Sequence, residues 1–109
     1  MKKLSKPEEW LLLAICNLRE NAYGVEIMKY VSLKTGYEWS IGSVYVPLDR
    51  LARVGYVETY LGEPSAIRGG RKKRYFRITD EGIAALRENI RVQNEMLKGL
   101  PDLLPEGLT

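Results

Sequence analysis

The chain has 109 residues, enough for one compact domain, and its 17 Lys and Arg against 14 Asp and Glu give a net charge of +3. It has no His and one Cys, which excludes a Ser-His-Asp or Cys-His nucleophile, the usual zinc sites and an internal disulfide. Its longest uncharged run, Trp39–Leu48, has ten residues, well short of the roughly 17–25 that cross a bilayer. We therefore expect a cytoplasmic binding protein with no catalytic residue, metal site or cofactor.

Helix signals come first along the chain. Ser5 followed three residues later by Glu8 is typical of a capping box, and the helix after it is expected to end near Glu20. Apolar residues recur at helical spacing again from about Tyr23 to Lys34, and Gly36 supplies a stop signal. Two short helices are therefore predicted in this part of the chain.

A third helix and two strands follow. Ser40 is placed to cap a helix that runs through Arg53. The hydrophobic period then changes from about 3.6 residues to about 2, which predicts strands. These strands are Tyr56–Leu61 and Arg71–Ile78, joined by a loop that begins at Gly62.

A last helix is predicted from Thr79, whose hydroxyl can cap it, to about Lys98. The order α-α-α-β-β-α is that of a winged helix-turn-helix, a mainly helical α+β fold in which the hairpin forms the wing. We predict a winged helix-turn-helix DNA-binding domain at 1–78, a C-terminal dimerisation helix at 79–100 and a flexible tail at 101–109.

The low net charge conceals one strongly basic segment. Residues 66–77 contain six basic residues and no acidic one, whereas residues 78–109 carry a net charge of −3. Cations on a projecting loop, beside glycines that permit close approach, suit phosphate contacts or minor-groove insertion. A solvated edge strand, whose lysines block aggregation, is the alternative. We favour anion binding, with Arg68, Arg71, Lys72 and Lys73 as candidate contacts.

The start of the third helix is small and polar, and the N-terminal end of a recognition helix is the part that reaches base edges. Ser40 and Ser43 are candidates for base or phosphate contacts. Gly42 permits close approach, and Tyr45 offers a ring and a hydroxyl. Arg50, nearer the helix end, is a candidate phosphate contact. Capping alone for Ser40, and partial burial for Tyr45, are the alternatives.

Five stretches of the chain together resemble the PadR family of bacterial transcriptional regulators in their order and spacing. They are Ala22–Ile27, Gly42–Leu51, Gly55–Val57, Arg68–Phe76 and Ile78–Gly82. The resemblance covers about residues 9 to 86, and the single C-terminal helix is similar to that of the short branch of the family.

The resemblance implies a homodimer, usually a repressor, whose winged helices bind an inverted-repeat operator in double-stranded DNA. Carried over by position, Tyr23, Ser43 and Tyr45 are helix-turn-helix contacts, and Arg71 and Lys73 are wing contacts. It also implies a small aromatic effector, because related proteins stack planar effectors on aromatic side chains at the dimer centre.

Apolar residues of the last helix follow a heptad seam, interrupted by a single glutamine. A helix of about 20 residues spans roughly 30 Å, so its distal half overhangs a domain of this size. We predict that this half packs against the first helix of a partner, with Gln93 and Met96 near the dimer centre. The interface candidates are Trp10, Leu12, Ile90, Gln93, Met96, Leu97 and Leu100; for Ile83 and Leu86, packing on their own core is equally open.

Three further side chains have both a packing and a functional interpretation. Cys16 lies in an apolar run, which favours burial as a small hydrophobe over redox sensing. Trp10 and Trp39 are interpreted as packing residues, with ligand stacking as the alternative.

The sequence thus predicts a dimeric, sequence-specific DNA-binding transcriptional regulator, specifically a repressor released by a small-molecule effector. A protein–protein interaction module on the same scaffold, without specific DNA binding, is the alternative.

Overall fold

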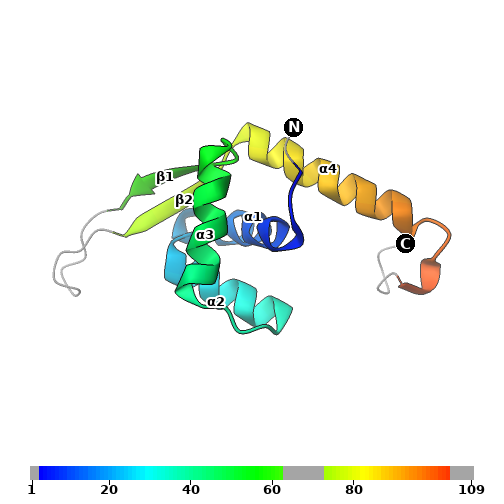
Figure 1. Ribbon diagram of the computed structural model, residues 1–109, viewed down its shortest axis with the longest axis horizontal. Coiled ribbons are helices and arrows are strands. Elements are labelled where there is room, and N and C mark those ends of the chain that lie inside the picture. The colour runs from blue at the N-terminus through cyan, green and yellow to red at the C-terminus, as the bar shows by residue number, and fades with distance from the viewer. Residues whose placement is uncertain (1–2, 63–72, 104–109) are drawn as a thin grey trace.

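The computed structural model describes residues 3–62 and 73–103. Its helices are α1 (Lys6–Leu18), α2 (Gly24–Thr35), α3 (Ile41–Arg53) and α4 (Asp80–Leu97), and its strands are β1 (Val57–Leu61) and β2 (Arg74–Ile78) (Figure 1). Short 3₁₀ helices follow α1 at Arg19–Asn21 and α4 at Pro101–Leu103. Three helices, an antiparallel hairpin and a C-terminal helix confirm the predicted winged helix-turn-helix.

Local capping interactions fix where the helices begin. At α1 the Glu8 backbone N–H donates to Ser5 Oγ (3.3 Å), and the Ser5 N–H donates to Glu8 Oε1 (2.7 Å), completing the predicted capping box. At α4 the Gly82 N–H donates to Thr79 Oγ1 (3.0 Å). The end of α2 is also fixed by a local signal, because Gly36 follows the helix in the left-handed conformation with a φ of 77°.

The hydrophobic core is built around α1, which packs against α2, α3, β2 and α4. Two consecutive residues of α1, Leu11 and Leu12, are both fully buried. Phe76 of β2, the largest fully buried side chain in the described part of the chain, belongs to the same core as Leu48 of α3. Leu12 therefore offers no surface to a partner, and its predicted role as a dimer contact is wrong.

The wing is tied to the start of α2 by an isolated β-bridge that sequence periodicity did not predict. Strands β1 and β2 pair antiparallel, with Thr59 opposite Phe76. On the other side of β2, the Phe76 N–H donates to the carbonyl of Ala22 (2.8 Å), and Tyr23 forms a bridge with Tyr75. The link between α1 and α2 thus joins the hairpin and holds it beside the helix-turn-helix.

Helix α4 and the wing project at opposite ends of a molecule that measures 55 × 29 × 22 Å (Figure 1). Within α4 the buried residues end at Leu86, so the distal half extends beyond the core. The 3₁₀ helix at Pro101–Leu103 stands where we expected a frayed tail, and residues 104–109 lie outside the described part. None of the helices in the described ranges has the length and apolar character needed to cross a membrane.

Gly82→Ala is expected to lower the free energy of unfolding by about 1–3 kcal/mol, the usual cost of overpacking. A Cβ at Gly82 would collide with the backbone carbonyl oxygen of Tyr56, which cannot move without disturbing β1. Urea denaturation measures the change. Gly42→Ala is the matched control, because a Cβ there meets only Ser40 Oγ at 3.9 Å, so its stability should stay level or rise slightly. Equal stability of the two variants would contradict this packing.

Candidate nucleic-acid interface

Two serine residues are exposed at the start of α3, and their hydroxyls also cap the N-terminal end of this helix. The Ser40 N–H donates to Ser43 Oγ (2.8 Å), and the Ser43 N–H donates to Ser40 Oγ (3.1 Å), so the two serines form a capping box. Both residues are exposed, and the first turn of α3 holds no acidic residue, whereas those of α1, α2 and α4 do. The positive end of the α3 dipole is therefore open to an anion.

Tyr45 braces α3 against α2. A Cβ at Gly24, at the start of α2, would collide with the Tyr45 hydroxyl, so the glycine makes this close approach possible. The Tyr45 ring also lies 6.2 Å from the Phe76 ring. Tyr45 is half-buried, as its alternative interpretation expected, while Gly42, one turn earlier, is exposed, and a Cβ there would meet Ser40 Oγ at an ordinary 3.9 Å.

Aromatic rings at the base of the wing hold cations in place. Tyr75 stacks on Tyr60, with ring centroids 5.5 Å apart, and meets the edge of Tyr23 at 5.4 Å. Lys73 Nζ lies 4.3 Å from the centre of the Tyr23 ring, and the Arg77 guanidinium lies 5.3 Å from that of Tyr60. Sequence reasoning missed Tyr60 and Tyr75, although both fall in its predicted strands.

Lys73 and Tyr23, predicted separately as contacts, are thus brought together where the wing meets the start of α2. The other predicted wing contacts, Arg68, Arg71 and Lys72, lie outside the described residues. Arg74, a further cation of the basic segment, forms an ion pair with Asp49 of α3 (3.0 Å). It therefore joins the wing to the third helix.

Arg50 forms an ion pair within the protomer while its side chain is still 37% exposed, so its role as a phosphate contact stays a prediction. Its Nη1 forms an ion pair with Oε2 of Glu8, whose side chain is only 6% exposed. A buried carboxylate is costly without such a partner, so the guanidinium compensates for the burial of Glu8. No sequence pattern links residues 42 positions apart, which is why this pair was missed.

The structure also shows the surroundings of Cys16, Trp10 and Trp39, each of which had a packing and a functional interpretation. Cys16 is exposed, so the expectation that it is buried is wrong; partial burial nevertheless raises the pKa of its thiol and lowers the thiolate fraction near neutral pH. Trp10 lies within 6.3 Å of the rings of Tyr37 and Trp39. Trp39 Nε1 donates to Thr35 Oγ1 (3.2 Å), so both tryptophans take part in packing.

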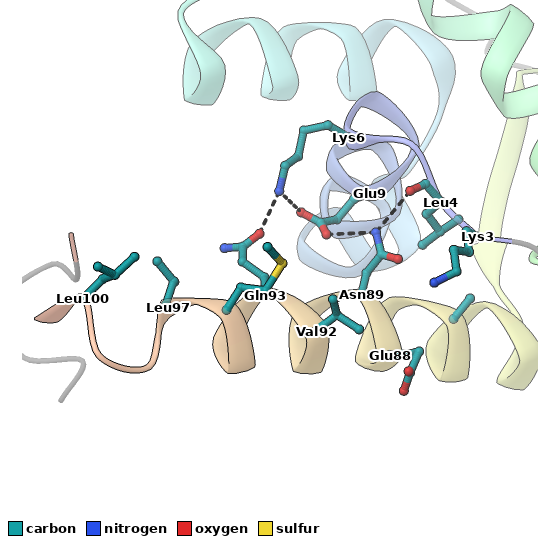
Figure 2. Close-up of a pocket in the computed structure, with 12 residues that line it drawn as sticks. Lys3, Leu4, Lys6, Glu9, Glu88, Asn89, Val92, Gln93, Leu97 and Leu100 are labelled. Atoms are coloured by element: carbon teal, nitrogen blue, oxygen red, sulfur yellow. Dashed lines mark hydrogen bonds and ion pairs between the residues drawn. The ribbon is translucent and has the colours of Figure 1, made fainter.

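A groove of about 830 Å³ runs between the start of α1 and α4 (Figure 2). Three of the predicted interface residues, Ile90, Met96 and Leu100, are 39%, 75% and 50% exposed. Gln93 is exposed and Leu97 half-buried, whereas Leu86 is buried in its own core. The apolar surface beyond Leu86 is therefore available to a partner.

Arg50→Ala is expected to lower the free energy of unfolding by about 1–3 kcal/mol, because it leaves the Glu8 carboxylate buried without its cation. Arg91→Ala is the matched control: it removes an exposed pair with Glu88, which solvent screens, and should leave the free energy of unfolding nearly unchanged. Urea denaturation compares the two variants. Equal losses in the free energy of unfolding would mean that the Arg50–Glu8 pair stabilises the fold no more than an exposed pair does.

Comparison with known proteins identifies a family for this chain. Residues 12–88 match the model of the transcriptional regulator PadR-like family. An uncharacterised protein X from Lysinibacillus sphaericus is 34% identical over 93 residues, which is 84% of this chain and 82% of that protein.

Solved structures agree with the family model. A PadR-like transcriptional regulator from Bacillus cereus is 26% identical with a TM-score of 0.71, covering 88% of both chains. A PadR family transcriptional regulator from Eggerthella lenta is also 26% identical, with a TM-score of 0.65, covering 89% of this chain and 82% of that one. The chain therefore belongs to the PadR-like family of transcriptional regulators, a family of regulators rather than enzymes, and DNA binding is its implied activity.

Proposed function

We propose that the protein is a homodimeric, cytoplasmic repressor that binds an inverted-repeat operator and is released by a small aromatic effector. One observation carries the DNA-binding part: the cation Lys73 lies on the ring of Tyr23 at the start of α2, and Tyr45 of α3 packs on the adjacent Gly24. Residues 1–78 would form the DNA-binding unit, and 79–100 the dimerisation helix.

In this proposal each protomer places the start of α3 in a major groove. Ser40, Gly42 and Ser43 are the residues nearest the bases, since they are exposed at the N-terminal end of the helix. Tyr45 orients α3 through its packing on Gly24, and its exposed part takes a supporting contact.

The wing would lie over the adjacent backbone or minor groove. Lys73 and Tyr23 supply a cation and a hydroxyl at its base, and Arg68, Arg71 and Lys72 extend the basic segment. Phosphate contacts of this kind position the protein, while the start of α3 reads the sequence.

The distal half of α4 supports dimerisation. Ile90 and Met96 of this half, and Leu100 just after the helix, are exposed apolar side chains beyond the core. Trp10, Gln93 and Leu97 complete the proposed interface. Two-fold symmetry then sets two recognition helices about one turn of DNA apart, roughly 34–36 Å.

Repression would follow from occlusion of a promoter, and induction from a ligand that changes the angle between the two DNA-binding units. Helix α4 is the element suited to transmit that change, because it connects the wing to the proposed dimer seam.

Lys73→Ala is expected to weaken binding to a duplex selected from a random pool, and to make the log–log salt dependence shallower by about 0.9 per protomer. Fluorescence anisotropy across a salt series measures both effects. Lys34→Ala is the matched control, because Lys34 also lies over a tyrosine ring, that of Tyr30 at 5.8 Å, at the far end of α2. It should leave both quantities unchanged.

Equal affinity for the selected and for random duplexes would refute an operator-binding function. A stable protein partner that covers the wing, with no duplex preference, would establish the interaction module instead.

Ile90→Glu is expected to convert the dimer to a monomer, because it places a charge in an apolar seam. Light scattering after size-exclusion chromatography measures the mass. Leu61→Glu is the matched control, since Leu61 is 65% exposed on β1, at the opposite end of the molecule (Figure 1). A wild-type monomer, or dissociation by both variants, would contradict the proposed interface.

A further inference from the structure

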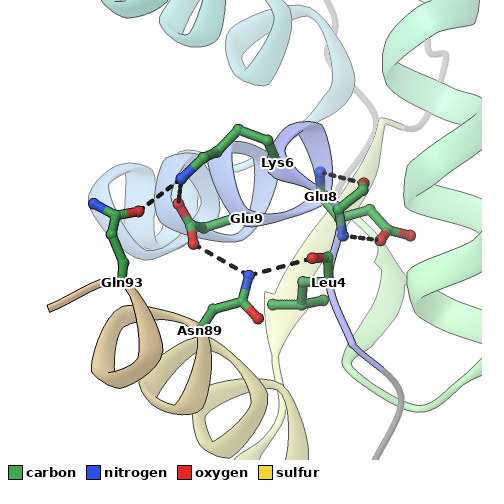
Figure 3. Close-up of polar contacts among 7 residues, drawn as sticks. Leu4, Lys6, Glu8, Glu9, Asn89 and Gln93 are labelled. Carbon is green, nitrogen blue, oxygen red and sulfur yellow. Dashed lines mark hydrogen bonds and ion pairs between the residues drawn. The ribbon is translucent and has the colours of Figure 1, made fainter. Parts of the chain in front are cut away.

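The first turn of α1 buries two neighbouring carboxylates, Glu8 and Glu9, which are only 5% and 6% exposed. Burial of a charge is costly unless partners compensate for it. Successive residues of a helix point about 100° apart, so the two side chains face different neighbours. Figure 3 shows Glu9 directed towards α4 and Glu8 turned to the other side of the helix.

Glu8 ties α1 to the recognition helix. Its Oε1 accepts the Ser5 backbone N–H (2.7 Å), and its Oε2 pairs with Arg50 in the last turn of α3. The position of α3 is thus fixed to the same turn that caps α1.

Glu9 ties the same turn to α4. Its Oε1 accepts from Asn89 Nδ2 (3.2 Å), and its Oε2 accepts from Lys6 Nζ (3.2 Å). Lys6 Nζ also donates to Gln93 Oε1 (2.7 Å), and Asn89 Nδ2 also donates to the Leu4 carbonyl (3.3 Å) (Figures 2 and 3). Asn89 and Gln93 lie one turn apart, so two successive turns of α4 are held.

These polar contacts lie where apolar packing of α4 ends. No residue of α4 beyond Leu86 is fully buried, so the distal half depends on Asn89 and Gln93 for its attachment to α1. Apolar contacts tolerate sliding, whereas directional hydrogen bonds specify the rotation and register of a helix. The network therefore defines an angle between α4 and the rest of the protomer.

We propose that Glu9, Asn89 and Gln93 are positioning residues that set the half-site spacing which the dimer accepts. The pair of Glu8 with Arg50 fixes α3 to the same turn of α1. This inference rests on the proposed function. If α4 forms the dimer seam, its angle to α3 decides how far apart, and at what rotation, the two recognition helices stand.

Spacing is a sensitive readout of that angle. One extra base pair between half-sites adds about 3.4 Å and roughly 35° of rotation, since one turn takes about 10–10.5 base pairs. The half-site sequence is a separate readout, because the groups proposed to read it, at the start of α3, do not belong to the network.

The experiment selects duplexes from a random pool with the full-length protein and sequences them. Asn89→Ala and Gln93→Ala should retain the wild-type half-site sequence but accept spacings that differ by one or more base pairs. Their affinity for the wild-type spacing should fall by about fivefold or more, the lower end of typical coupling between sites, while affinity for a single half-site stays within roughly twofold. Gln93 is exposed, so its variant keeps the fold if Asn89→Ala does not.

Asn94→Ala is the matched control, because Asn94 is an exposed asparagine of the same helix. It should retain the wild-type spacing. A wild-type protein with one preferred spacing, retained by both network variants, would overturn this inference and leave the proposed function standing. A wild-type protein that selects no duplex, or no fixed spacing, would overturn both.

Discussion

The burial of α1 among all its neighbours is the constraint on which the rest of the structure depends. Leu11 and Leu12 are consecutive and both fully buried, so α1 has no broad solvent face around them. The same enclosure reaches its first turn, where it buries Glu8 and Glu9. Their partners come from α3 and α4, so α1 helps to fix the positions of both helices.

The candidate DNA face also depends on a contact outside the regular elements. The hydrogen bond from Phe76 to Ala22 brings β2 beside the start of α2, and with it Lys73 reaches the Tyr23 ring. The basic segment thereby has a fixed base at the start of α2, on which Tyr45 of α3 packs. The acidic excess lies in residues 78–109, on and beyond α4, so local attraction coexists with a net charge of only +3.

The features that sequence predicts here are local ones. Ser5 with Glu8 and Thr79 with Gly82 are capping contacts between residues three apart, and a one-dimensional pattern contains all the information they need. The pairing of Arg50 with Glu8 joins residues 42 positions apart. Because its partner comes from another helix, the sequence did not reveal this ion pair.

The same limit applies to burial. Leu12 and Cys16 sit in one apolar run, yet Leu12 is buried in the core and Cys16 is exposed, because only the packing around α1 decides which side is covered. On α4 the heptad pattern identified the stripe, but only the structure separates Leu86, which serves its own core, from the exposed Ile90.

Hydrogen exchange of the protein with and without a selected duplex tests the DNA-binding face most directly. Bound DNA is predicted to slow exchange of the backbone amides at residues 40–45 and at the base of the wing around residue 73. The amides around Trp10 in α1, away from the proposed DNA contacts, should keep their rates. Protection that spares the start of α3, or that falls around Trp10 instead, would contradict the assignment of α3 and the wing as the DNA-binding surface.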